Sequence, residues 1–415
     1  MSLPPHQSDN MSTVHSSAQS KVDEGLLDYS HEPSWTQSNL LVHCEKPFNA
    51  EPPLPALVNA GQITPTDIFF KRNHGPIPDI SLENHQICIG VQRNTPDIEW
   101  KVISMRDIIS KWPKATVTAT IQCAGNRRDG LAAVKEVSGV IWKSGAVSTA
   151  TWSGARLCDV IRDVADIPAD DLSRMLRDFH VSFEAGDHVR EDVCYGGSIP
   201  LRKAMDPLGD VILAYEMNDQ PLAREHGFPL RVIVPGFIGA RSVKYLKKII
   251  VQPQESALFF QRQDYKIFAP TINDTNVEEA WDSTASLGEM NVQCVICTPT
   301  EDEVIPSLEP VTVKGYAIAG GGKGIYRVEV SIDGGDTWET VDKMEQKCDE
   351  RSGMFWTWAI WEKTVPRINS SAELVARAYD SSGNMQPEHP IWNYRGVMNN
   401  AWSRAHVTQV PQDCM

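Results

Sequence analysis

The chain has 415 residues, of which 41% are hydrophobic and 22% are charged, and its formal net charge is −15. This length and composition exclude a wholly disordered chain and favour two folded domains. The acidic balance argues against nucleic acid and anionic membranes as main partners, and no apolar run approaches the roughly 20 residues that cross a bilayer. A small anionic substrate is not excluded, but it would need a local basic pocket.

The first part of the chain in sequence order is a polar segment followed by a mixed region. Residues 1–44 are rich in Ser, His and Gln and predict a disordered tail. Residues 45–270 interleave strand and helix patterns, which predicts an α+β domain with a mixed sheet. The strands are expected at 86–91, 117–122 and 230–234, and the helices at 105–112 and 157–165.

Helical patterns then give way to short strands separated by turn residues. The strands are expected at 292–297, 311–318, 326–332, 355–361 and 374–379. This pattern predicts an all-β, sandwich-like second domain over residues 271–415, with the boundary between 266 and 285.

The most distinctive string is Ile121–Arg128, in which a β-rich run ends at Cys123 and a Gly/Asn turn leads into Arg127 and Arg128. Two adjacent guanidinium groups favour a thiolate and can hold an anion. A thiolate is also a good ligand for a soft or high-valent metal. From the residues alone, a structural cysteine at a strand end is an equally good interpretation.

Two other motifs are better explained as structure. Cys294 and Cys297 form a C-x-x-C without a second pair or a nearby His, and in a strand they point to opposite faces. Gly320–Gly324 is glycine-rich but lacks the spacing of a phosphate loop, so we expect a hairpin loop there.

Three basic loops punctuated by glycine are more suggestive together than apart. They are Phe70–Pro76, His226–Arg231 and Gly239–Lys244. Each alone is typical of an ordinary turn or a solvated loop. Together they predict a phosphate and pterin cradle built from backbone N–H groups and cationic side chains.

Taken in order, these strings resemble the sulfite oxidase family, within the broader group that includes assimilatory nitrate reductases. The matching strings run from about Pro47 to Val407, nearly the whole ordered chain. Leu213–Asn218, Asp333–Trp338 and Trp392–Gly396 continue the series. So many matches in the same order are very unlikely by chance.

The resemblance implies a molybdenum held by molybdopterin, with Cys123 as the protein ligand to the metal. It implies cofactor-binding roles for Phe70, Lys71, Arg72, Asn73, His74, Asp187, His226, Arg231, Ser242, Val243 and Lys244. It implies a substrate pocket formed by Arg72, Arg128, Trp142, Tyr265 and Arg395. The second domain would be an immunoglobulin-like dimerisation domain, which makes the protein a homodimer.

The implied reaction is the oxidation of sulfite to sulfate, with two electrons passed to oxygen or another acceptor. Arg side chains suit an oxyanion, Trp142 would wall the pocket, and Tyr265 would donate a hydrogen bond or help move a proton. Tyr265 and Arg395 favour sulfite, because nitrate reductases commonly carry Met at the site of Arg395. A nitrate reductase-like enzyme and a non-catalytic protein on the same fold are the alternatives.

The resemblance also sets expectations about what the chain lacks. About 45 residues precede the match, too few for a haem domain, so we expect a plant-like form with no haem and no flavin. That form passes electrons to oxygen. The odd set of nine cysteines and the absence of targeting signals favour a soluble intracellular protein, with the cytosol most consistent and the mitochondrion or peroxisome implied by relatives. Ser138 departs from the basic residue common near the pocket mouth.

Overall fold

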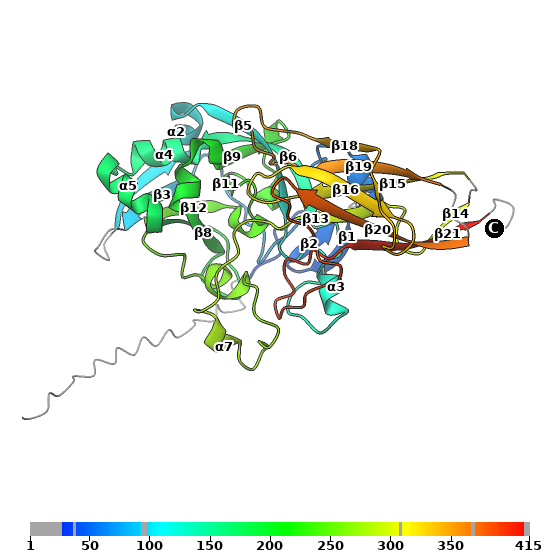
Figure 1. Ribbon diagram of the computed structural model, residues 1–415. Coiled ribbons are helices and arrows are strands. Elements are labelled where there is room, and N and C mark those ends of the chain that lie inside the picture. The colour runs from blue at the N-terminus through cyan, green and yellow to red at the C-terminus, as the bar shows by residue number, and fades with distance from the viewer. Residues whose placement is uncertain (1–26, 36–38, 93–97, 307–308, 367–369, 411–415) are drawn as a thin grey trace, which may run out of the picture.

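The computed structural model describes residues 27–35, 39–92, 98–306, 309–366 and 370–410. In Figure 1, helices and mixed sheets occupy one side of the molecule, and a body made of strands alone extends from it toward the C-terminus. No helix in the described ranges is long and apolar enough to cross a membrane.

The first half of the chain builds two larger sheets. One has the order β4-β3-β12-β7-β8, in which β12 runs parallel to β3 and antiparallel to β7. Its strands are β3 (Gln86–Gln92), β4 (Ile98–Ser104), β7 (His180–Ala185), β8 (Gly196–Pro200) and β12 (Leu246–Gln252). The other has the order β10-β9-β6-β5, with β11 also paired to β9. Its strands are β5 (Lys114–Gln122), β6 (Val147–Arg156), β9 (Ile212–Met217), β10 (Gln220–Pro221) and β11 (Arg231–Ile233).

Short helices connect and cover these strands. They are α1 (Leu54–Asn59), α2 (Met105–Lys111), α3 (Arg128–Ala132), α4 (Leu157–Val164), α5 (Ala169–Asp178), α6 (Leu201–Met205) and α7 (Val277–Ala280). Tighter single turns are η2 (Pro207–Gly209), η3 (Arg224–His226) and η4 (Gly239–Arg241), and a π-helical turn is η5 (Phe260–Asp264). Helix α2 begins where Ser104 and Asp107 form a reciprocal capping box, and it buries Met105 and Ile108. The expected helices near 105 and 157 and the strands near 86, 117 and 230 are confirmed.

The last third forms a β-sandwich of two sheets. Their orders are β13-β15-β19-β18 and β14-β21-β20-β16-β17. The strands are β13 (Gln293–Thr298), β14 (Glu303–Pro306), β15 (Val311–Ile318), β16 (Ile325–Ser331), β17 (Glu339–Thr340), β18 (Lys343–Gln346), β19 (Ala359–Val365), β20 (Ser370–Asp380) and β21 (Ser403–Val410). Alternate residues of β21 are buried, as expected for a strand with one face on a core. The prediction of an α+β region followed by an all-β sandwich is therefore confirmed.

The two cysteines of the C-x-x-C motif belong to different cores. Cys294 packs within the sandwich, whereas Cys297 packs in the cluster that continues into the first half of the chain. Both are fully buried on β13. The prediction that they lie on opposite faces of a strand, with a structural role, fits this placement.

Two local expectations were wrong. The strand expected at 355–361 begins only at Ala359, because the preceding residues pack on β5: Trp356 O accepts from Thr120 N at 2.9 Å, and Trp358 N donates to Thr120 Oγ1 at 2.9 Å. The glycine-rich stretch 320–324 is not a hairpin loop, because β15 and β16, which it joins, belong to different sheets.

The expected tail also ends earlier than predicted. Strand β1 (Leu41–Glu45) pairs antiparallel with β2 (Phe48–Glu51), and the ring of Trp35 stacks on Phe48 with centroids 4.0 Å apart. Residues 27–35 and 39–44 are thus part of the fold, because aromatic stacking and strand pairing hold them. Residues 1–26 and 36–38 of the predicted tail lie outside the described residues.

A buried carboxylate joins the two halves of the molecule. The side chain of Asp210 is fully buried and pairs with Arg156 Nη1 at 2.6 Å. It also accepts from Trp356 Nε1 at 2.9 Å and pairs with Arg351, both in the segment that precedes β19. Three donors from distant parts of the chain therefore converge on one carboxylate.

We predict that Asp210→Ala lowers the free energy of unfolding by about 3–5 kcal/mol, because it leaves the partly buried Arg156 and the buried Nε1 of Trp356 without their acceptor. The measurement is urea unfolding. Asp282→Ala is the control, because it breaks the exposed Arg262–Asp282 pair and should cost no more than about 1 kcal/mol. Equal losses for the two variants would contradict a special role for Asp210.

Candidate active site

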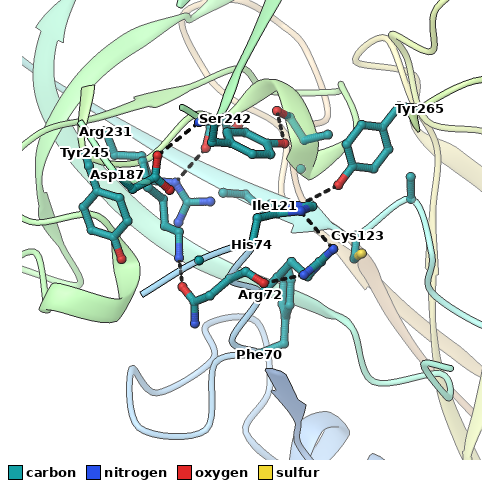
Figure 2. A pocket seen from close by; sticks show the side chains of 17 residues that line it. Phe70, Arg72, His74, Ile121, Cys123, Asp187, Arg231, Ser242, Tyr245 and Tyr265 are labelled. Atoms are coloured by element: carbon teal, nitrogen blue, oxygen red, sulfur yellow. Dashed lines mark hydrogen bonds between the residues drawn. The ribbon is translucent and has the colours of Figure 1, made fainter. Parts of the chain in front are cut away.

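One cavity, of about 600 Å³ including the space open to solvent, brings together residues from many parts of the first half of the chain. Figure 2 shows side chains from these segments converging on it. Its wall is formed by Phe70, Arg72, Asn73, His74, Gly75, Ile121, Cys123, Ala124, Asp187, Tyr195, Arg231, Gly239, Ala240, Ser242, Lys244, Tyr245 and Tyr265. All three basic loops of the sequence contribute to this wall, so the structure does gather them around Cys123.

Cys123 lies immediately after β5, where the strand gives way to a tight turn. Its backbone N–H donates to Ala146 O at 2.9 Å, and its carbonyl accepts from Asn126 N at 3.0 Å. Gly125 N donates to the sulfur at 3.4 Å. The side chain is 6% exposed and belongs to the cavity wall. A fixed backbone thus presents one sulfur to the cavity.

A hydrogen-bond chain links an arginine, a histidine and a tyrosine on this wall. Arg72 Nη2 lies 3.2 Å from His74 Nδ1, and His74 Nε2 lies 3.0 Å from Tyr265 Oη. Burial and the nearby Arg72 lower the pKa of His74 well below its usual value, so the imidazole is neutral. Arg72 can only donate, so Nδ1 accepts and Nε2 carries the proton. Tyr265 therefore accepts from His74 and can donate through its own O–H, which lies beside the hydroxyl of Tyr195.

The opposite part of the cavity is cationic. Arg231 donates from Nε to Ser242 O at 3.1 Å and from Nη1 to His226 O at 3.3 Å. The ammonium of Lys244 donates to Asn73 Oδ1, and to Glu225 O at 2.8 Å. Burial, reinforced by Arg231, lowers the pKa of Lys244 to about 7.

Asp187 supplies a carboxyl group to the same region. Its Oδ1 accepts from Tyr195 N at 3.2 Å, and burial raises the pKa of the carboxyl group to about 6. Lys244 and Asp187 are thus both pushed toward their neutral forms by the low polarity of the protein around them.

A second, outer cavity, of about 880 Å³ including the space open to solvent, adjoins the first, because Arg72 and His74 line both. Arg395, Asp264 and Ser138 lie on its wall. Arg395 forms an ion pair with Asp264 and donates to Ser138 Oγ at 3.3 Å. Ser138, which stands where relatives often carry a basic residue, is therefore a hydrogen-bond partner of Arg395, the predicted substrate arginine.

Several residues expected in the site lie beside these two cavities and not on their walls: Lys71, Arg128, Trp142, His226 and Val243. Lys71 donates to Asp67 O at 2.8 Å, and Arg128 donates to Gly396 O at 2.8 Å and to Val140 O at 2.6 Å. Trp142 is fully buried, and its Nε1 has no hydrogen-bond partner. The roles expected for these five residues stay predictions.

Arg127 does not contribute to the anion site that the sequence predicts beside Cys123. Its Nη1 donates to Ala401 O at 2.6 Å, and its Nη2 donates to Trp402 O at 3.2 Å. This side chain points into the second half of the chain, because its φ of 63° turns the backbone at that residue. Of the two adjacent arginines, neither guanidinium group lines the cavity.

Two tyrosines on the wall were missed by the sequence reasoning. Tyr195 donates to Ala240 O at 2.9 Å and packs against His74, with ring centroids 4.7 Å apart. Tyr245, next to Lys244, has a buried hydroxyl without a hydrogen-bond partner. No motif marks Tyr195, but the position of Tyr245 directly after a basic loop was a usable signal.

Two family models match the chain, one over the α+β region and the other over the β-sandwich. An oxidoreductase molybdopterin binding domain covers residues 74–260, and a Mo-co oxidoreductase dimerisation domain covers residues 284–410. The solved sulfane dehydrogenase SoxCD from Paracoccus pantotrophus has a TM-score of 0.70 and covers 97% of this chain and 93% of its own, at 21% identity. That level of identity shows a shared fold alone. Fold and family models define the class as molybdopterin-binding oxidoreductases.

Curated relatives narrow the class. Mouse mitochondrial sulfite oxidase is 44% identical over 90% of this chain, which spans 66% of the mouse protein's length, just under two thirds. Sulfite oxidase of Arabidopsis thaliana is 42% identical over 92% of this chain and 96% of its own length. NADH nitrate reductase 1 of the same plant is 39% identical, over 43% of its length. The chain belongs to the sulfite oxidase family.

The depressed pKa of Lys244 predicts a pH dependence of stability. Between about pH 7 and the usual lysine range, the unfolded chain binds a proton that the folded chain does not, so folding becomes more favourable as pH rises. In cofactor-free protein, the stability of wild type relative to Lys244→Met should therefore increase from pH 7 to pH 9. Urea unfolding at several pH values measures it. A constant difference would refute the prediction, and Lys343→Met, at an exposed lysine, is the matched control.

Proposed function

We propose that this chain is a molybdenum-dependent sulfite oxidase that converts sulfite to sulfate and passes two electrons to an acceptor. The observation that carries the proposal is the position of Cys123, whose sulfur shares one cavity with Arg72, Arg231 and Lys244. A thiolate suits molybdenum, and the cations suit a phosphate-bearing cofactor and an oxyanion. The curated sulfite oxidases of mouse and Arabidopsis support the choice of substrate.

The donor set of the cavity fits molybdopterin. Lys244 and Arg231 are satisfied by neutral oxygens, which leaves their positive charge available to a phosphate. The unpartnered hydroxyl of Tyr245 and the side chain of Ser242 add polar groups to the same wall. When bound, the cofactor would supply a metal centre for oxygen-atom and electron transfer, with Cys123 as its protein ligand.

Arg72 is placed to meet the substrate, because it lines both the inner cavity and the outer one. Its guanidinium group offers planar donors to a sulfite oxygen in a site shielded from the global negative charge. His74 donates to the hydroxyl oxygen of Tyr265, so the hydroxyl proton of Tyr265 points away from His74. Tyr265 would therefore donate this hydrogen bond to an oxygen of the substrate or product.

Arg395 adds a second positive charge, on the wall of the outer cavity. Its ion pair with Asp264 and its hydrogen bond to Ser138 hold it on the wall of the outer cavity. An anion that enters there meets a guanidinium group already partly neutralised, so binding is weaker than at a free arginine and release stays easy. Tyr265 and Arg395 favour sulfite over nitrate, the leading alternative.

The first test is turnover by protein loaded with molybdenum. We expect sulfite consumption with ferricyanide or oxygen as acceptor, and little nitrate reduction with an artificial donor. Loaded protein that is inert with sulfite and reduces nitrate would favour the nitrate reductase alternative. Failure to take up molybdenum during expression with cofactor supply would favour a non-catalytic protein.

Cys123→Ser should remove sulfite turnover and leave the fold intact, because an alcohol replaces the thiolate ligand with no change in backbone. The measurements are steady-state turnover, molybdenum content and size-exclusion chromatography. Cys158→Ser, at a buried cysteine on α4 outside the cavity, is the matched control. Near-normal turnover in Cys123→Ser would contradict the assignment of the ligand.

Tyr265→Phe should lower kcat/KM for sulfite by about 10- to 100-fold, the effect of losing one hydrogen bond to a charged group. Stopped-flow reduction by sulfite and steady-state kinetics measure this loss. Tyr215→Phe, on β9 and outside both cavities, is the control. An unchanged kcat/KM in Tyr265→Phe would remove that residue from the proposed pocket.

The finer features implied by the resemblance belong to the same proposal. We propose a homodimer, which the match to a dimerisation domain supports, and domain limits at 45–270 and 271–415. We also propose oxygen as the acceptor and a form with no haem and no flavin, on the resemblance to the plant-like form alone. An absorption spectrum and an assay for hydrogen peroxide test both. The cytosolic location stays a prediction.

A further inference from the structure

The turn that carries Cys123 is held largely by the second half of the chain. Met398 N donates to Ala124 O at 2.7 Å, immediately beside the cysteine. Asn399 Nδ2 donates to Arg127 O at 2.7 Å, and Arg127 itself donates to two carbonyls near residue 401. The residues on both sides of the sulfur thus depend on a segment about 270 residues away in sequence.

Tyr316 makes a further contact with this turn from inside the sandwich. It lies on β15 and is fully buried. Its hydroxyl accepts from Asn126 Nδ2 at 3.1 Å and donates to Ser144 O at 2.8 Å. One phenol therefore ties the cysteine turn to the loop that precedes β6.

The path from this phenol to the sulfur is short. Asn126 Oδ1 accepts from Ala146 N at 3.0 Å, and Ala146 O accepts from Cys123 N at 2.9 Å. Asn126 N in turn donates to Cys123 O at 3.0 Å. Asn126, Ala146 and Cys123 form a closed hydrogen-bonded ring, and Tyr316 holds this ring through the amide of Asn126. A shift of the phenol therefore moves the backbone that orients the sulfur.

We propose that Tyr316 is a positioning residue for the Cys123 thiolate, and that the sandwich orients the metal ligand in addition to any part in dimerisation. This inference rests on the proposed role of Cys123 as ligand. The partners that orient a ligand also tune the metal, so the hydroxyl of Tyr316 should affect the metal's electronic structure without touching it. A purely structural tyrosine would change stability alone.

The first arm uses the full-length chain without cofactor, so it does not depend on molybdenum or turnover. The probe is iodoacetamide, and peptide mass spectrometry follows the modification of Cys123 over time. The exposed Cys348 gives an internal reference for the reagent. Cys123 is 6% exposed and lines the cavity, so the rate of its reaction depends on how firmly the turn holds the sulfur. Tyr316→Phe should raise the Cys123 rate about fivefold, the factor for one lost hydrogen bond.

Tyr326→Phe is the matched control, because it makes the same change on the neighbouring strand β16 at a tyrosine that is 56% exposed. Its Cys123 rate should equal that of wild type. Asn126→Ala removes the Tyr316 hydrogen bond and also the bond from Ala146 N, so it should raise the Cys123 rate at least as much as Tyr316→Phe. If Tyr316→Phe does not fold, an unchanged rate in Asn126→Ala overturns the proposal. The double variant should react no faster than the faster single variant, because both act along one path. Additive effects would overturn this path.

The second arm uses molybdenum-loaded protein. After partial reduction, the electron paramagnetic resonance spectrum of Tyr316→Phe should differ from wild type, while that of Tyr326→Phe should not. A wild-type alkylation rate together with a wild-type spectrum in Tyr316→Phe would overturn the proposal. Protein that takes up no metal would defeat the proposed function, and the alkylation arm would still decide whether Tyr316 holds the turn.

Discussion

The structure depends on three cationic side chains buried around one thiol, with one carboxyl group, that of Asp187, on the same cavity wall. Arg72, Arg231 and Lys244 share the cavity of Cys123, and their hydrogen-bond acceptors are neutral oxygens and one imidazole nitrogen. Burying three cationic groups beside a single carboxyl group is costly, so the site is stabilised when an anion enters. This constraint explains how a chain of net charge −15 can select an anionic cofactor and an anionic substrate.

The cavity also explains why the α+β region and the β-sandwich pack tightly against each other. Strand β5 is the edge of its sheet, and the segment before β19 covers that edge through Thr120. Asp210 gathers donors from both halves, and the cysteine turn is held by residues near 398. A sulfur on a turn at an open edge would be mobile. Packing the sandwich against that edge fixes the sulfur relative to the cationic wall.

Much of this arrangement was predictable from local sequence. The β-rich run into Cys123 and the three basic loops carry signals of strand ending and of glycine turns, which act over a few residues. The limits of strand β19, the pairing of β1 and the place of Arg127 depend on contacts between distant segments, which no local pattern encodes. The roles of Tyr195 and Tyr316 could not be predicted for the same reason. A single buried tyrosine cannot be distinguished from a core residue until the partner of its hydroxyl is known.

The central claim is that sulfite delivers electrons to a metal bound at Cys123. Its most direct test is an anaerobic titration of molybdenum-loaded protein with sulfite, with the metal's absorption and the sulfate formed measured on one sample. We expect the metal to become reduced and one sulfate to appear for every two electrons that the metal accepts. An unchanged spectrum with sulfite, combined with reoxidation of chemically reduced protein by nitrate, would contradict it.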